Sequence, residues 1–164
     1  MNLQNIKNRY LQISIGLVYL WFGALKFFPN VSPAEELATN TINELTHFLI
    51  PSNIAIILLA LWETAVGICF LLNFHKRWSI RIATVHMFLT FTPLYFFPEL
   101  IFNDNIFSLT LVGQYIIKNL IILGALGVLW LETIPTSVAN KEKEKTAAAP
   151  TLGFNKLFRL RWTK

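Results

Sequence analysis

The sequence predicts an all-α integral membrane protein: a four-helix bundle with both termini in the cytoplasm, an outer amphipathic helix and a cytoplasmic tail. Three observations carry this prediction. Hydrophobic residues make up 54% of the 164 residues and charged residues only 14%, whereas about a quarter of a soluble domain is charged. Four apolar segments reach the length of about 20 residues that a bilayer requires. The charges that flank these segments change sign from one loop to the next.

The four predicted spans are expected to be helices, because a backbone amide in lipid must find its partner within the segment. Several prolines lie at span edges, where the missing amide donor costs little. Pro93 lies inside the third span and should bend it, which frees a carbonyl one turn earlier. The spans cover residues 10–28, 52–72, 78–97 and 113–131.

The flanking charges predict the orientation. Basic residues precede the first span and surround the turn between the second and third spans, whereas the other two loops hold acidic residues and no Lys or Arg. By the positive-inside rule, both termini are cytoplasmic. The basic flanks are Lys7, Arg9, Lys76, Arg77 and Arg81, and the acidic loops contain Glu35, Glu36, Glu44, Glu99 and Asp104.

The longer outer loop predicts an amphipathic helix over residues 33–49. Ser32 to Glu35 read as a capping box with Pro33 at the first helical position, and the apolar residues that follow share one arc. Such a helix is either an interfacial anchor or a lid over the mouth of the bundle.

The net charge of +5 belongs entirely to the tail, because residues 1–134, the predicted transmembrane domain, hold as many acidic as basic side chains. Because nucleic-acid-binding proteins present a basic surface on their folded part, the zero net charge of residues 1–134 excludes a nucleic-acid partner. Residues 135–164 form a basic cytoplasmic tail, whose last part either lies on the anionic inner leaflet or is unstructured. The single cysteine, Cys69, excludes a thiol–disulfide mechanism within this chain.

Polar residues inside the spans are the candidates for a functional site, since an ionisable side chain in lipid costs on the order of 2.5–3.5 kcal/mol and usually faces the bundle interior. Glu63 lies near the middle of the second span, too deep to reach an interface. An ion pair with Lys118 or Lys26 would cancel much of its burial cost. Six residues are candidate ligand-binding residues: Lys26, Glu63, His86, Gln114, Lys118 and Asn119.

Each candidate also has a structural interpretation. A Glu63–Lys pair is either a packing clamp or part of a polar cavity that takes the head of an apolar ligand or handles a proton. Lys26 taken alone is an anchor whose ammonium reaches the outer interface. His86 shares a face with Thr90, and is either a satisfied core histidine or a proton relay or hydrogen-bonding partner of a ligand carbonyl.

Gln114, Lys118 and Asn119 cluster in the first turns of the fourth span. They form either the rim of an outward-facing polar pocket or a set of helix–helix hydrogen bonds. The sequence has no cluster of metal-ligating residues. Haem would need a second axial ligand at the depth of His86, but His47 and His75 lie in loops on opposite sides of the membrane. We therefore expect no metal and no covalently bound cofactor, and assign no catalytic residue.

Three stretches of the sequence resemble the DoxX-like family of small bacterial four-span membrane proteins. They are Gly16–Pro29 with its Trp-x-Gly-x-x-Lys pattern, Trp62-Glu63-x-x-x-Gly67, and Gly113–Leu120 with its Lys-Asn pair. The resemblance covers roughly residues 9–133. It implies a four-helix bundle, multi-pass in the bacterial inner membrane. The name-giving members are subunits of a membrane thiosulfate:quinone oxidoreductase, and others are linked to redox stress.

Three functions are compatible with these residues. The first is a membrane subunit or accessory protein of a quinone-linked redox system, with Lys26, Glu63, His86 and Lys118 offered to a quinone. The second is a non-enzymatic scaffold or assembly protein whose buried charges only specify helix packing. The third is a small proton-coupled carrier, which would have to dimerise to alternate access. The expected partners are the lipid bilayer and either a second copy or the subunits of a redox complex.

Overall fold

The computed structural model describes residues 3–134, with the backbone alone at position 4, and this part is all-α. The predicted tail, residues 135–164, lies outside the described residues. The chain divides into two units, Met1–Leu131 and Glu132–Lys164, and the helices of the described residues belong to the first. The helices are α1 Leu3–Leu25, α2 Glu35–Leu45, α3 Ser52–Leu71, α4 Lys76–Leu89, α5 Pro93–Phe96, α6 Pro98–Ile101 and α7 Leu111–Leu131.

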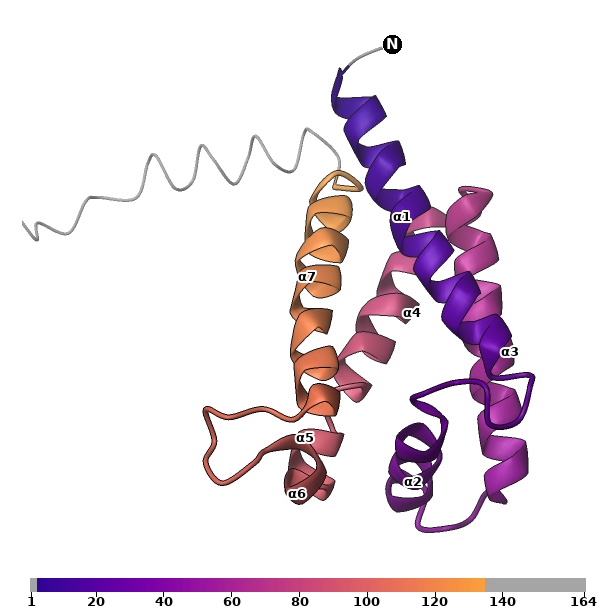
Figure 1. Ribbon diagram of the computed structural model, residues 1–164. Helices are drawn as coiled ribbons and strands as arrows, with labels where there is room; N and C mark the ends of the chain where they lie inside the picture. The colour runs from indigo at the N-terminus through magenta and orange to yellow at the C-terminus, as the bar shows by residue number, and fades with distance from the viewer. Residues whose placement is uncertain (1–2, 135–164) are drawn as a thin grey trace, which may run out of the picture. The chain divides into compact units, whose positions relative to one another are not determined.

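Within the first unit, α1 packs along α3 and α4 packs along α7 (Figure 1). The short helix α2 packs on α3, and α5 and α6 lie at the end of α7 where that helix begins. Side chains from α1, α3, α4 and α7 meet in one apolar core. Its buried members are Ile15, Tyr19, Val66, Phe70, Ile80, Ala83, Met87, Leu126 and Leu129.

Glycine allows α1 and α3 to approach closely. A Cβ added at Gly67 of α3 would lie 2.6 Å from the backbone nitrogen of Leu20, and one added at Gly23 of α1 would lie 2.7 Å from that of Thr64. Both distances are shorter than real Cβ atoms show, so only glycine fits. The prediction that Gly67 admits a neighbouring helix is confirmed.

Two side chains of α1 cap the end of α3. Gln12 is buried and donates from Nε2 to the carbonyl oxygen of Phe70 and to Oδ1 of Asn73, both at 2.8 Å. Arg9 donates to the carbonyl oxygen of Leu71 at 2.9 Å. The Phe70 carbonyl also accepts from the backbone amide of Asn73 at 3.2 Å, so Gln12 adds a bond to the turn that closes α3. The sequence analysis assigned neither residue this role.

The third predicted span is interrupted. The helix α4 ends at Leu89 and α5 begins at Pro93, which has no amide to offer the carbonyl of Leu89. That carbonyl accepts instead from the backbone amide of Thr92 at 3.1 Å and from its hydroxyl at 2.7 Å. The predicted bend at Pro93, with a carbonyl freed one turn earlier, is confirmed.

Among the described helices, α3 and α7 are long and apolar enough to cross a membrane. Their bounds match the second and fourth predicted spans closely. The helix α1 begins at Leu3, before the first predicted span, and ends at Leu25, so that Lys26 lies just beyond its last turn.

The helix in the long loop is shorter than predicted, and its capping box is wrong. No side chain caps α2, and the buried hydroxyl of Ser32 has no hydrogen-bond partner. Asn30 adopts a left-handed conformation (φ 63°), and its backbone amide bonds to the carboxylate of Glu35 at 2.8 Å. Because this turn engages the Glu35 side chain, the carboxylate does not reach back to Ser32 as a capping box requires.

The end of this helix also differs from the prediction. His47 and Phe48 have positive φ and lie beyond the last helical turn, and Phe48 is exposed. Asn43, expected on the polar arc, is buried and donates to the hydroxyl of Ser52 at 3.0 Å. A hydrogen bond to the next helix therefore decides which face of α2 is buried.

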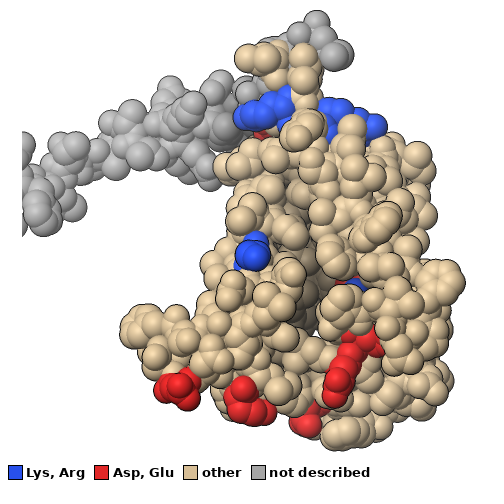
Figure 2. Space-filling model, viewed as in Figure 1, with Lys and Arg blue, Asp and Glu red and all other residues tan. Residues whose placement is uncertain are grey.

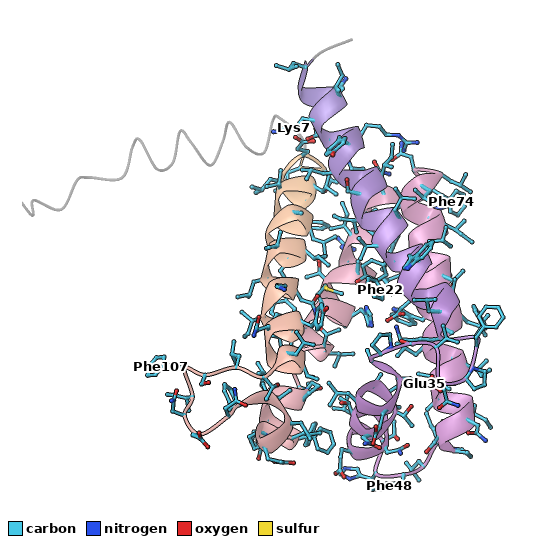
Figure 3. All side chains as sticks on the ribbon, in the orientation of Figure 1. Lys7, Phe22, Glu35, Phe48, Phe74 and Phe107 are labelled. Carbon is cyan, nitrogen blue, oxygen red and sulfur yellow. The ribbon has the colours of Figure 1, made fainter. Side chains whose placement is uncertain are left out.

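Charged residues of the first unit separate towards its two ends. Lys and Arg gather at one end and Asp and Glu at the other, and the broad band between them is uncharged on this face except for one basic side chain on its surface and a few charged atoms within a hollow (Figure 2). Lys7 and Phe74 lie at the first end, and Glu35 and Phe48 at the second (Figure 3). The band carries many exposed apolar side chains. They include Leu17, Trp21, Ile57, Leu61, Val85, Phe88, Leu120 and Ile121.

Candidate functional site

The centre of the candidate site is an ion pair between α1 and α3. The ammonium nitrogen of Lys26 lies 2.5 Å from Oε2 of Glu63, and both side chains are at most 10% exposed. The same nitrogen lies 3.2 Å from the carbonyl oxygen of Phe22, to which it donates. The structure therefore pairs Glu63 with Lys26 and not with Lys118. A buried, paired Lys26 is not the interfacial anchor that it would be if taken alone.

His86 of α4 extends this pair into a polar chain. Its Nε2 lies 3.5 Å from Oε1 of Glu63, and its Nδ1 lies 3.1 Å from the hydroxyl oxygen of Tyr19. The Tyr19 hydroxyl also lies 3.1 Å from the carbonyl oxygen of Ala83. Polar atoms thus run from Lys26 through Glu63 and His86 to Tyr19, drawn from three helices that are otherwise apolar at this depth.

Tyr19 is the site residue that sequence analysis missed. An aromatic residue at helical spacing in an apolar span reads as core, and Tyr19 does belong to the apolar core. The signal that could have found it is the phenolic hydroxyl, which needs a hydrogen-bond partner when it is buried. A tyrosine in place of phenylalanine inside an apolar span therefore indicates a polar neighbour.

The Tyr19 hydroxyl fixes the direction of the hydrogen bonds in this polar chain. It donates its single proton to the carbonyl oxygen of Ala83, so its oxygen is an acceptor for Nδ1–H of His86. The other ring nitrogen of His86, Nε2, faces Oε1 of Glu63.

Asn119 lies one helical turn away from this chain. Its Nδ2 donates to the hydroxyl of Thr90 at 3.2 Å, and that hydroxyl donates to the carbonyl of Met87 at 2.7 Å. Thr90 follows His86 by one turn, as the shared polar face predicts. Asn119 thus brings α7 to the polar face of α4.

Gln114 and Lys118 do not join the buried chain. Both side chains are exposed on α7, and the ammonium nitrogen of Lys118 lies 5.1 Å from the centre of the Tyr115 ring. Of the six candidates, the structure brings Lys26, Glu63 and His86 together, sets Asn119 beside them, and leaves these two on another face. No group of three His, Cys, Asp or Glu side chains in residues 3–134 could hold a metal ion.

An ammonium, an imidazole and an amide are the hydrogen-bonding groups of the site. Lys26 donates to Glu63 and to the carbonyl of Phe22, and Asn119 donates to Thr90. Comparison of the chain with family models, with curated proteins and with solved structures finds no match. The function is therefore argued from the site.

Proposed function

We propose that this chain is a DoxX-like protein of the bacterial inner membrane with four spans and both termini in the cytoplasm. The exposed apolar band between a basic and an acidic end supports the insertion (Figure 2). Soluble monomers rarely expose apolar patches beyond a few hundred Å². The apolar window of α7 is only 17% buried, so this helix lacks the cover of a soluble core helix. The basic end faces the cytoplasm.

Cysteine labelling in intact cells tests this orientation. With Cys69 replaced by Ala, Asn103→Cys between α6 and α7 should react with a membrane-impermeant maleimide added outside. Phe74→Cys between α3 and α4 should react only after the membrane is permeabilised. Both positions are exposed, so accessibility in the folded protein is matched. The opposite labelling pattern, or equal labelling of both, would contradict the proposed topology.

Within this bundle the chain serves as a membrane subunit or accessory protein of a quinone-linked redox system, and the Lys26–Glu63–His86 set receives the polar head of the quinone. The observation that carries this function is the convergence of three buried ionisable side chains from three helices. Each such side chain costs on the order of 2.5–3.5 kcal/mol in lipid, so a cluster marks a functional site by default.

His86 is the member best suited to meet a ligand. The 3.5 Å between Nε2 of His86 and Oε1 of Glu63 is longer than an ordinary N–H···O hydrogen bond. Lys26, in contrast, donates to Glu63 at 2.5 Å and to the carbonyl oxygen of Phe22 at 3.2 Å. A bound quinone supplies the two-electron, two-proton chemistry. The imidazole donates to one carbonyl oxygen, and the nearby ammonium stabilises negative charge that develops there.

A scaffold whose charges only clamp the helices is the second candidate. It is favoured by the position of the pair beside a close contact between α1 and α3, where Gly23 meets Glu63 and Thr64. In this case the Lys26–Glu63 bond fixes the crossing of the two helices, and no ligand is needed.

Quinone binding separates the two functions. The purified full chain is titrated with decyl-ubiquinone, a short-chain analogue, and co-purified quinones are identified by mass spectrometry. We expect saturable binding that His86→Gln weakens about tenfold, the cost of one buried hydrogen bond. Thr64→Val is the control, because its buried hydroxyl has no partner. Absence of binding by the unmodified chain would favour the scaffold.

A further inference from the structure

A second polar cluster lies at the basic end of the molecule, away from the Lys26–Glu63 pair. The guanidinium carbon of Arg81 lies 5.1 Å from the centre of the Trp78 ring and 5.1 Å from that of the Trp130 ring. Trp78 and Arg81 are one turn apart on α4, and Trp130 comes from the last turn of α7. We call these three residues the Arg81 cluster.

The two indole rings fix the direction of the Arg81 side chain. Cation–π contacts occupy faces of the guanidinium group, while its N–H groups lie in the guanidinium plane and can bind a planar or tetrahedral anion bidentately. Within residues 3–131 no carboxylate lies against Arg81. The side chain is therefore ordered before any anion binds, and its strongest donors still lack an anionic acceptor in this part of the chain.

The charges around the cluster add to the positive potential. Lys76 and Arg77 form the first turn of α4, and that turn contains no acidic residue. Cations are unfavourable at this end of a helix, where the backbone dipole is itself positive. The positive-inside rule explains why basic residues lie at this end, but it does not require that two tryptophans hold one of them.

We propose that the Arg81 cluster, with Lys76 in the same helix, binds the phosphate of an anionic phospholipid in the cytoplasmic leaflet. Basic sites between adjacent helices at this side of a membrane suit anionic headgroups, and tryptophan prefers the headgroup level. Exposed apolar side chains of α4 continue from the cluster towards the middle of the band, where the acyl chains would lie; these are Val85 and Phe88. The assignment rests on the proposed membrane orientation and is independent of quinone binding.

Lipid titration of the full chain in a neutral detergent tests this assignment. Phosphatidylglycerol, phosphatidylcholine and inorganic phosphate are compared, with bound lipid counted by native mass spectrometry and Tm followed by the loss of helical circular dichroism. Phosphatidylglycerol should raise Tm by about 5 °C near saturation, and the other two should not. Arg81→Ala should weaken its binding about tenfold, and Arg81→Lys should lie between, because it keeps charge but loses the bidentate donors.

Lys7→Ala is the matched control. It removes one exposed positive charge from the same end without touching either tryptophan, and should change affinity less than about threefold, because one diffuse surface charge contributes little. Equal losses in Arg81→Ala and Lys7→Ala would overturn the assignment, since diffuse charge would then explain binding. Equal stabilisation by inorganic phosphate, or no preference for phosphatidylglycerol, would also overturn it. Arg81→Lys keeps the test decisive if the alanine variant fails to fold.

Discussion

Replacing Glu63 by Gln is expected to lower the free energy of unfolding by about 3–5 kcal/mol, because it leaves the buried ammonium of Lys26 without its counter-charge. The ammonium nitrogen of Lys26 lies 2.5 Å from Glu63, and it also donates to the neutral carbonyl of Phe22. Lys26→Met alone should cost a similar amount for the converse reason. Unfolding of the full chain in mixed micelles with increasing SDS, followed by circular dichroism, measures each value.

The double variant Lys26→Met with Glu63→Gln should recover most of this loss. When both charges are removed, no single charge is left buried without a partner, although the attraction between the two is also lost. Replacing a buried ion pair by uncharged side chains therefore often leaves the free energy of unfolding nearly unchanged. Thr64→Val, at the neighbouring position in α3, should change stability by less than about 0.5 kcal/mol, because its hydroxyl has no partner to lose. A double variant no more stable than the worse single variant would contradict the paired arrangement.

The same variants bear on function. If the double variant is stable and the unmodified chain binds a quinone that the double variant does not, the pair acts in binding and not only in packing. If the double variant is stable and the unmodified chain never bound a quinone, the clamp explains the close packing of the two helices and the quinone proposal is wrong. Stability and binding therefore have to be measured on one set of proteins.

The partner of Glu63 illustrates what the sequence can predict. Hydropathy and the positions of prolines give the depth of a residue along its helix, so Glu63, Lys26 and Lys118 were all expected from the middle to the outer half of the spans. Depth does not reveal which helices are neighbours. The structure places α1 against α3, so Lys26 meets Glu63, while Lys118 lies on an exposed face of α7.

Local features were predicted where one residue type permits one geometry. Gly67 indicated a close helix contact and Pro93 a break, and both are present. The capping box failed because the Glu35 carboxylate accepts from the backbone amide of Asn30, and the Ser32 hydroxyl is left without a partner. Tyr19 was missed because its apolar ring fits the core pattern while its hydroxyl depends on His86, 67 positions away.

Replacing Gly67 by Ala is expected to destabilise the protein by about 3 kcal/mol, the upper range for overpacking a tight interior contact. The added Cβ would lie 2.6 Å from the Leu20 nitrogen and 2.9 Å from the Gly16 carbonyl oxygen, and both are backbone atoms that no side-chain rotation can move. The helix α1 must therefore shift away from α3. Because Lys26 directly follows α1 and Glu63 belongs to α3, that shift should also weaken their ion pair.

Gly124→Ala is the matched control for Gly67→Ala, since both change a glycine inside a long apolar helix to the same residue. Nothing lies within 4 Å of a Cβ added at Gly124, so this change should stabilise α7 by up to about 1 kcal/mol through helix propensity. The two alanine variants should thus change the free energy of unfolding in opposite directions. Equal, small effects would mean that α1 and α3 do not pack as closely as described, and the Lys26–Glu63 pair, which depends on that contact, would lose its structural basis.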